Sequence, residues 1–417
     1  MLPDAGTPFI GQRVFCPPEE VDRLGVPVHF LEAGNLLPEG REDDVCAWEE
    51  QSETDAVDPL ACRRKGANHL SSLQDVPLVR PFSALRYDVT AAGDLSRLVA
   101  PPYDVISDAQ RLDYLARSPY NVVRLTLPDS PEDAARDLAA WRGAGILQEE
   151  PERYWWVAQD YTGPDGISRT REGLGASVPV TPYEDGEVLP HERTHAGPKE
   201  GRLRLLRATH TQLEPIFLLY DADPIFERPG GAPAMDVEEG GVRTRVWPVV
   251  GGEVELGTPL LIADGHHRYE TAVAYREENP RATHLFGILV SARSPGVEIF
   301  PTHRIVKSVG DVPGDEVDAP NGGVTLYRGG QYVRVASDDD FGPRIVESLH
   351  PAGVTYTSSA DEAIATVDRG DAAAAFLLEP VTFEQVARFA HAGETMPQKS
   401  TFFYPKLTSG LLLFPLP

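Results

Sequence analysis

The stretch LLIADGHHRYETA, Leu260 to Ala272, carries the strongest fold signal in the sequence. Its first four residues are apolar and predict a buried strand, and Gly265 permits a tight turn after Asp264. Tyr269 and Ala272 then lie on one face of a following helix. The stretch therefore predicts a strand, a turn and a helix N-terminus, which directs free backbone N–H groups and a positive dipole end toward any anion above the turn.

Two interpretations of this turn remain open. In the structural one, Asp264 caps the helix and the histidines bond to core carbonyls. In the functional one, His266, His267 and Arg268 contact phosphate or carboxylate. Cations in the first helical turn oppose the helix dipole, and such breaks of a local rule concentrate at functional sites. The pattern therefore favours a site.

A metal could also bind here. His266 and Glu270 are four residues apart, and His267 and Glu270 are three apart, so each pair shares a helical face. No spacing supplies a third ligand for a transition metal. Magnesium held by Asp264 together with substrate phosphates is the more natural metal, because that ion needs only one or two protein carboxylates.

The composition is that of a globular protein, with 417 residues of which 41% are hydrophobic. A formal net charge of −26 would repel nucleic acid and anionic lipid, so we expect neither as a partner. Neither a membrane span nor a secretory signal is visible, and we expect a cytoplasmic protein. Cys16, Cys46 and Cys62 have no metal-ligand spacing and are interpreted as free thiols. Nothing in the sequence indicates the oligomeric state.

Three segments are expected. Between residues 39 and 58 nine carboxylates face one base, Arg41, so residues 1–75 are predicted to be an acidic, disordered extension. Residues 76–310 are predicted to form the main α/β domain with a mixed sheet. Residues 311–417 are predicted to form a smaller α/β unit that closes with Leu411 to Phe414. The Gly-, Pro- and Asp-rich stretch Gly310 to Gly323 between them is typical of a linker.

Hydrophobic periodicity predicts the main elements. Strands are expected over residues 122–127, 154–159, 214–221, 259–263, 285–290 and 373–378, with a hairpin turn at 163–166. Helices are expected over residues 131–141, 360–369 and 383–391, the first of them opened by Ser130 and Pro131.

A basic cluster occupies PHERTHAGPKEGRLRLLRATHTQLEPIF, Pro190 to Phe217. In so acidic a chain it predicts an anion contact, since arginine binds phosphate or carboxylate through two parallel hydrogen bonds. Arg202 to Arg207 also has the spacing of an ordinary basic helix face, and that alternative stays open. The candidate phosphate contacts are Arg193, Lys199 and Arg202. His191 and Glu192 add acid–base capacity beside them.

A third cluster, MPQKSTFFYPKLTSG, spans Met396 to Gly410. Lys399, Ser400 and Thr401 supply one charge and two hydroxyls, which is typical of an anion or nucleotide contact loop. It is not a Walker motif, because no glycine-rich run precedes the lysine. A further stretch, LVAPPYDVIS, presents Tyr103 and Asp104 after two prolines.

Seven stretches resemble the successive signature blocks of the bacterial and archaeal family called domain of unknown function 1015. They are RPFSALRY, VAPPYDVIS, SPYNVVRL, PHERTHAGPKEGRLRLLRA, IADGHHRYETA, FPTHRIV and MPQKSTFFYPKLTSG. The resemblance runs from about Leu78 onward. A remoter similarity links the strand followed by D-G-H-H-R to free-serine kinases with a ParB-like fold, and Gly265, Arg268 and the displaced Ala272 to the nucleotide-phosphate motif of ParB. This similarity implies a ParB-like nucleotide-binding core in which Asp264, Gly265, His266, His267 and Arg268 contact phosphate and magnesium.

The sequence as a whole favours a phosphotransferase that moves a phosphoryl group from ATP or ADP to the hydroxyl of a small, serine-like metabolite. Asp264 would hold Mg²⁺. Asp264, His267, Glu192 and His191 are the catalytic candidates, with either of the last two as the base. A non-catalytic nucleotide-binding switch and a metal-dependent hydrolase are the alternatives.

Overall fold

The computed structural model describes residues 76–192 and 196–417. The acidic segment 1–75, with its three cysteines, and Arg193 lie outside the described residues. Within those ranges no helix combines the length and the apolar character needed to cross a membrane.

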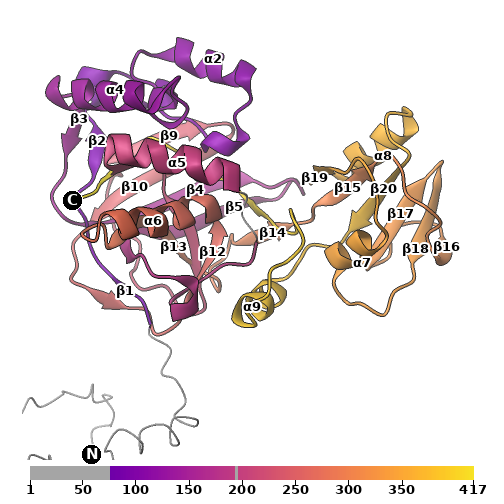
Figure 1. The fold of residues 1–417 in the computed structure, drawn as a ribbon. Coiled ribbons are helices and arrows are strands. Elements are labelled where there is room, and N and C mark those ends of the chain that lie inside the picture. Colours follow the sequence, from indigo (N-terminus) through magenta and orange to yellow (C-terminus); the bar gives the residue numbers. More distant parts are fainter. Residues whose placement is uncertain (1–75, 193–195) are drawn as a thin grey trace, which may run out of the picture. The chain divides into compact units, whose positions relative to one another are not determined.

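A mixed eight-stranded sheet forms the centre of the main body (Figure 1). Its order is β6 (Val188–Leu189), β12 (Leu260–Asp264), β8 (Ile216–Tyr220), β13 (His284–Ser291), β5 (Ser168–Pro179), β4 (Tyr154–Thr162), β10 (Val242–Val249) and β9 (Met235–Glu239). β12 runs parallel to β6, and β13 runs parallel to β8, whereas the other neighbours are antiparallel. The predicted α/β class with a mixed sheet is confirmed.

β8 is apolar along its whole length, and β12 is apolar up to Asp264, because both faces of the sheet are covered there. In β8, Phe217 and Leu219 point into one core, while Ile216 and Leu218 point into the core on the opposite face. β12 divides its residues in the same way. The strand that carries Asp264 is therefore held by packing on two sides, which fixes where it ends.

The helices of the described chain are α1 (Val89–Ala92), α2 (Asp108–Arg117), α3 (Val123–Thr126), α4 (Pro131–Gly143), α5 (Ala196–Thr209), α6 (His266–Glu278), α7 (Gly342–Ser348), α8 (Ala360–Asp368) and α9 (Phe383–His391). Figure 1 shows α6 and α5 side by side along the sheet, with α4 next to α5. Ser130 caps α4 by accepting a hydrogen bond from the Asp133 N–H, as its sequence predicts. Tyr269 of α6 packs into the sheet core.

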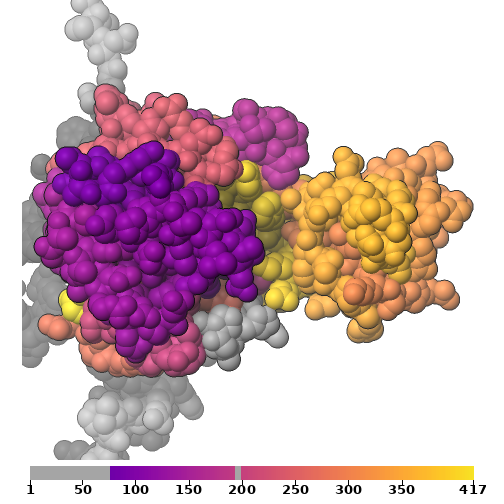
Figure 2. Space-filling model, turned by 90° about the horizontal axis from the view of Figure 1, so that it is seen from above, coloured from indigo at the N-terminus to yellow at the C-terminus, as the bar shows by residue number. Residues whose placement is uncertain are grey.

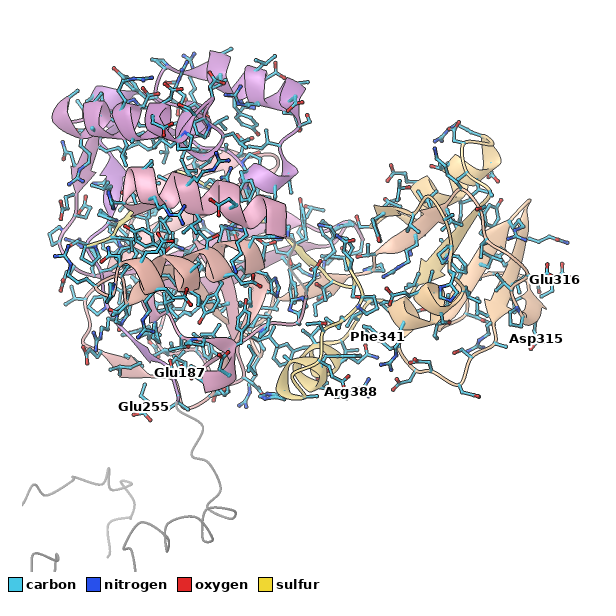
Figure 3. All side chains as sticks on the ribbon, in the orientation of Figure 1. Glu187, Glu255, Asp315, Glu316, Phe341 and Arg388 are labelled. Atoms are coloured by element: carbon cyan, nitrogen blue, oxygen red, sulfur yellow. The ribbon has the colours of Figure 1, made fainter. Side chains whose placement is uncertain are left out.

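A second sheet has six antiparallel strands in the order β16 (Gly314–Val317), β18 (Gln331–Val335), β17 (Val324–Arg328), β20 (Ala374–Leu378), β15 (His303–Val306) and β19 (Thr355–Thr357). α7 packs on one face and α8 on the other. Figure 3 labels Phe341, whose ring lies 4.7 Å from that of Phe389 in α9, and Arg388, which pairs with Asp340.

The segment after residue 396 contacts the main body. β21 (Phe402–Tyr404) pairs with β14 (Glu298–Phe300), and β22 (Phe414–Pro415) pairs with β7 (Thr211–Gln212). Leu413 bonds to Leu85 in β2 (Leu85–Tyr87), which itself pairs with β3 (Leu147–Glu149). β1 (Leu78–Val79) pairs with β11 (Val254–Glu255). The stretch Leu411 to Phe414, expected to close the smaller unit, thus lies against the main body.

The strand predicted over residues 122–127 is wrong, because α3 occupies Val123–Thr126. The Asn121 side chain accepts a hydrogen bond from the Val123 N–H and donates to the Arg97 and Val99 carbonyls. Asparagine can start a turn in this way. Val123 and Thr126 are both fully buried, so the segment is covered on several sides and its apolar pattern does not distinguish strand from helix.

The linker predicted over residues 310–323 is wrong in part, because β16 forms inside it. Asp315 and Glu316, labelled in Figure 3, are exposed on this edge strand and pair with Arg334 and Val333. Charged side chains are common on edge strands because they discourage pairing with another chain. Their polarity therefore disguises the strand in the sequence.

Candidate functional site

The strand–turn–helix predicted around Asp264 is present. β12 ends at Asp264, Gly265 has a left-handed φ of 100°, and α6 begins at His266. A Cβ atom at Gly265 would lie 3.2 Å from the Arg268 guanidinium as well as being strained. Asp264 does not cap the helix, since Gly265 is the N-cap and no side chain bonds there. The capping interpretation is therefore wrong.

Two cations bind the Asp264 carboxylate. Arg268 Nη2 lies 2.7 Å from Oδ2, and Lys406 Nζ contacts Oδ1. Burial raises the pKa of Asp264, but Lys406 and Arg268 together outweigh it and hold that pKa well below its usual range. Asp264 is therefore ionised at neutral pH, and its charge is balanced by one side chain four residues away and one from a distant part of the sequence.

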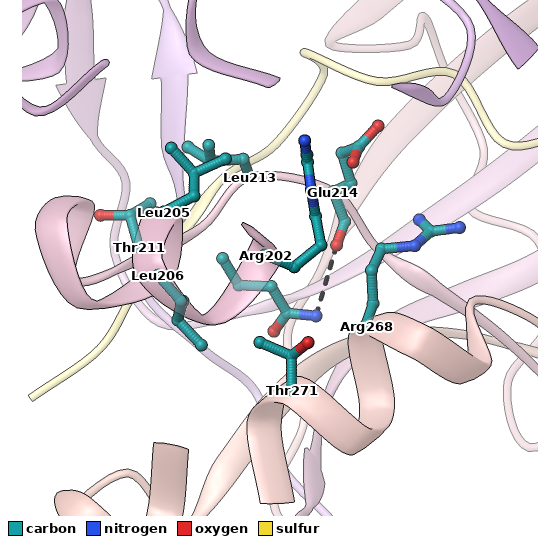
Figure 4. A pocket seen from close by; sticks show the side chains of 9 residues that line it. Arg202, Leu205, Leu206, Thr211, Leu213, Glu214, Arg268 and Thr271 are labelled. Atoms are coloured by element: carbon teal, nitrogen blue, oxygen red, sulfur yellow. Dashed lines mark hydrogen bonds between the residues drawn. The ribbon is translucent and has the colours of Figure 1, made fainter. Parts of the chain in front are cut away.

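Arg268 lies on the inner side of Asp264. It also donates to the Pro215 carbonyl and lines a cavity of about 50 Å³ with Arg202 and the buried Glu214 (Figure 4). Glu214 Oε1 accepts hydrogen bonds from the Tyr103 N–H at 3.0 Å and from Ser409 Oγ at 2.9 Å. Burial raises the pKa of Glu214, and Arg268 and Arg202 partly offset this. Arg268 thus links Asp264 to the Pro215 carbonyl, next to the buried Glu214.

Lys406 reaches Asp264 because two buried side chains hold its backbone. Arg171 Nη2 donates to the Pro405 carbonyl at 2.6 Å, and Gln159 Nε2 donates to the Lys406 carbonyl at 3.2 Å. Both come from the β4–β5 hairpin and bond to each other. The hairpin therefore sets the position from which the lysine extends.

His191 and His266 form a buried pair. Their ring centroids are 4.6 Å apart, His266 Nε2 accepts from the His191 N–H at 3.3 Å, and His191 Nε2 bonds to Thr401 Oγ1 at 3.0 Å. Burial lowers the pKa of His191 to about 4 and lowers that of His266 well below its usual value. Both rings are neutral at pH 7, so the expected cationic first turn is wrong at His266.

Asp264 opens on its outer side into a pocket of about 420 Å³. Figure 2 shows yellow residues of the C-terminal segment at the surface beside indigo and magenta residues of the main body. The polar and charged residues that line the pocket are Asp104, Glu192, Asp264, His266, Thr302, Tyr356, Thr357, Ser358, Lys399, Thr401 and Lys406. It thus combines three carboxylates with two ammonium groups.

Lys399 stands in this pocket on a strained backbone, with φ of 55°. Positive φ is uncommon for a long side chain and needs support from its surroundings. The Glu192 carboxylate accepts from the Lys399 N–H at 3.4 Å, and Ser400 Oγ donates to the Pro397 carbonyl at 2.6 Å. Met396 pairs with Glu192 as a bridge. Glu192 thus supports the backbone at Met396 and Lys399.

The structure brings together some of the expected site residues. One pocket is lined by Asp264, His266, Glu192, Lys399 and Thr401. His191 and Ser400 do not line it, but His191 bonds to Thr401 and Ser400 bonds to the Pro397 carbonyl.

Other expected residues point elsewhere. Lys199 pairs with Glu270 at 3.4 Å, and Arg202 donates to the Thr126 carbonyl with its guanidinium 3.9 Å from the Tyr103 ring centre. Arg268 faces inward. His267 follows His266 in α6, and the described lining of the pocket does not include it.

The magnesium expectation finds little support in the donor atoms. Within residues 76–192 and 196–417 no group of three or more His, Cys, Asp and Glu side chains is placed to hold a metal ion. Both Asp264 oxygens already bind cations. Asp264 does not fit a magnesium ligand while Lys406 remains on it.

Three important residues were given no role from the sequence. Lys406 lies at the end of the MPQKSTFFYPK stretch, and Arg171 and Gln159 lie in an ordinary hairpin. The stretch Tyr404-Pro405-Lys406 offers one signal for Lys406. A proline restricts the backbone angles of its own residue and of the residue before it, so the backbone that leads to Lys406 is constrained. Asp104 lines the pocket after Pro101 and Pro102, as its exposed turn suggested.

Fold and site together define a mixed α/β protein with a charged pocket beside the start of α6. The chain belongs to the family described as "Protein of unknown function (DUF1015)", whose model matches residues 79–319. No curated protein matches the chain in sequence.

Solved structures show a distant similarity. SbnI with C-terminal truncation from Staphylococcus aureus is 13% identical with a TM-score of 0.37, covering 56% of this chain and 84% of that one. A free serine kinase in complex with AMP is 14% identical with a TM-score of 0.33, covering 55% and 86%. A conserved hypothetical protein from Pyrococcus furiosus is 13% identical with a TM-score of 0.32, covering 55% and 90%. These values are too low to transfer a ligand or an activity.

Proposed function

We propose that this protein is a nucleotide-dependent phosphotransferase that acts on the hydroxyl of a small metabolite, with a serine-like hydroxy acid as the first choice. One observation carries the proposal: Lys399, Lys406 and Glu192 line a single pocket with the start of α6. Phosphoryl transfer needs positioning and charge neutralisation more than covalent chemistry. Two ammonium groups and one carboxylate base meet that need.

The donor phosphates bind between Lys406, Lys399 and the first turn of α6. The backbone N–H groups of a first turn have no partners inside the helix, and they point toward an anion placed there. Lys406 starts on Asp264, so a phosphate competes with that carboxylate for the ammonium. Asp264 then keeps its second partner, Arg268, which preserves the turn while the lysine moves to the ligand.

Glu192 is the better base of the two candidates. It lines the pocket, whereas His191 is buried with its Nε2 bonded to Thr401. Glu192 takes the proton of the acceptor hydroxyl as that oxygen bonds to the phosphorus. The bond from phosphorus to the bridging oxygen breaks, the departing phosphate keeps the electron pair, and Lys399 and Lys406 balance its charge.

A nucleotide-binding switch is the second candidate. The Lys406–Asp264 pair supports it, because a ligand that draws Lys406 away would also act on the segment around β21. A switch needs a difference in ligand affinity between two states and needs no base.

Conversion of the nucleotide distinguishes the phosphotransferase from the nucleotide-binding switch. Purified protein is incubated with ATP or ADP and a panel of hydroxy acids, and nucleotide conversion is followed by chromatography for wild type, Glu192→Gln, Lys406→Met and the exposed control Lys307→Met. The phosphotransferase predicts conversion that depends on an acceptor, is lost in Glu192→Gln and Lys406→Met, and persists in Lys307→Met. Binding without conversion in wild type supports the switch. Full activity in Glu192→Gln would exclude Glu192 as the base.

A further inference from the structure

The wall of the pocket opposite α6 comes from the six-stranded sheet. Thr302 precedes β15, and Tyr356 and Thr357 belong to β19, with Ser358 after them. The phosphate grip of the proposed function uses none of these residues. Their chemistry also differs, since they supply hydroxyls and one aromatic ring and no charge.

Tyr356 is the exposed aromatic side chain of the pocket, with 40% of its surface accessible. The other two rings there are packed. Phe403 is buried 5.8 Å from Phe217, and Phe402 is half-buried 5.8 Å from Tyr404, measured between ring centres. Tyr356 is therefore the ring that can offer a surface to a ligand.

Arg304 supports Tyr356. The two residues are direct partners across β15 and β19, so their side chains share a sheet face, and the guanidinium carbon lies 5.8 Å from the ring centre. Arg304 is buried, and its Nη1 donates to the Thr302 carbonyl at 2.9 Å. One side chain thus fixes both the aromatic residue and the threonine of this wall.

Thr302 contributes an unmatched polar atom. Its side-chain oxygen is buried and has no hydrogen-bond partner, although the residue lines the pocket at 9% exposure. Buried hydroxyls are nearly always hydrogen-bonded, so an unpaired one in a pocket wall points to a partner on the ligand.

We infer that this wall binds the base of the nucleotide, with the ring stacked on Tyr356 and one of its edge atoms bonded to Thr302. The inference rests on the proposed function and adds its donor subsite. A flat heteroaromatic ring carries both a π-face and hydrogen-bonding edge atoms, which match the exposed ring and the unpaired hydroxyl. The pocket volume of about 420 Å³ lies within the range of small-ligand sites.

The test compares ADP with inorganic pyrophosphate, which has phosphates and no base. Dissociation constants are measured by calorimetry for wild type, Tyr356→Ala, Tyr356→Phe, Thr302→Val and Tyr332→Ala, a control in β18 that contacts Tyr327. Tyr356→Ala is expected to weaken ADP binding roughly tenfold or more, the size of a lost base–aromatic contact, and to leave pyrophosphate binding unchanged. Thr302→Val gives a smaller loss for ADP alone. Tyr356→Phe and Tyr332→Ala resemble wild type.

Unchanged ADP binding in Tyr356→Ala overturns the inference, as does an equal loss for both ligands. These failures leave the phosphate grip standing, because wild type still binds pyrophosphate. If wild type binds neither ADP nor pyrophosphate, the proposed function itself fails and this inference fails with it. Circular dichroism of each variant confirms that a loss of binding is not a loss of fold.

Discussion

The two cations that bind Asp264 are held in different ways. Arg268 is four residues away in the first turn of α6, is buried, and also donates to the Pro215 carbonyl. Lys406 is 142 residues away, and its ammonium reaches into the pocket. The difference teaches that the charge of one carboxylate can be balanced by two partners of different kinds, one packed within the fold and one that lines a pocket.

Removal of the shared carboxylate should have the largest effect. Asp264→Asn leaves two buried or half-buried cations without a counter-charge, and we expect a loss of about 4 kcal/mol in the free energy of unfolding. Urea unfolding followed by circular dichroism measures it. Stability within about 1 kcal/mol of wild type would show that Asp264 does not organise these cations.

Removal of each cation separately tests whether Arg268 serves mainly stability and Lys406 mainly ligand binding. Arg268→Met should cost about 3 kcal/mol, since Asp264 loses an ion-pair partner and the Pro215 carbonyl loses its donor, whereas Lys406→Met should cost only about 1 kcal/mol because the pocket hydrates the carboxylate. Pyrophosphate binding should show the reverse order, with the larger loss in Lys406→Met. Equal effects in both assays would contradict the comparison.

Acid should destabilise the protein through the histidine pair. The pKa of His191 falls from 6.5 to about 4 on folding, so the unfolded chain binds the proton first as the pH falls. This contribution is complete above pH 6.5 and is lost between pH 6.5 and 4, and His266 acts in the same direction. We expect about 2 kcal/mol less stability at pH 5 than at pH 7.5 from His191.

Urea unfolding across this pH range measures whether the free energy of unfolding falls toward acid pH and whether His191 is the cause. His191→Gln should flatten the dependence, while the exposed His391→Gln should follow wild type. A stability that rises toward pH 5 would contradict the buried, neutral state of the pair.

The smallest effect is expected at Lys199, a cation in the first turn of α5 that does not line the pocket. It forms a half-exposed pair with Glu270, so Lys199→Met should change stability by about 0.5 kcal/mol or less. Pyrophosphate binding should remain as in wild type. A marked loss of binding would return Lys199 to the phosphate site that the sequence suggested.

Local patterns predicted much of the fold. The strand–turn–helix at Leu260 to Ala272, the β4–β5 hairpin, and α4, α8 and α9 follow from periodicity and capping residues, because short-range geometry determines them. The segment Val123–Thr126 was assigned the wrong element, because burial on several sides hides the helical period. β16 was missed because an exposed edge strand can be polar throughout.

The candidate site was predicted only where its residues lie in distinctive local motifs. Asp264, Glu192, Lys399 and Thr401 were identified because unusual residues cluster around them. Lys406 and Arg171 were given no role, since their importance comes from a contact with Asp264 and a contact with Pro405 across long sequence separations. No local spacing contains that information.

The separation between Asp264 and Lys406 also orders events during synthesis. A nascent chain emerges from its N-terminus, so β12 and α6 exist well before the lysine does. Until then Asp264 has only Arg268, and the pocket lacks a wall. The pocket around Asp264 is therefore complete only after Lys406 has emerged, and a chain interrupted between α6 and Lys406 would contain the DGHHR motif without this lysine.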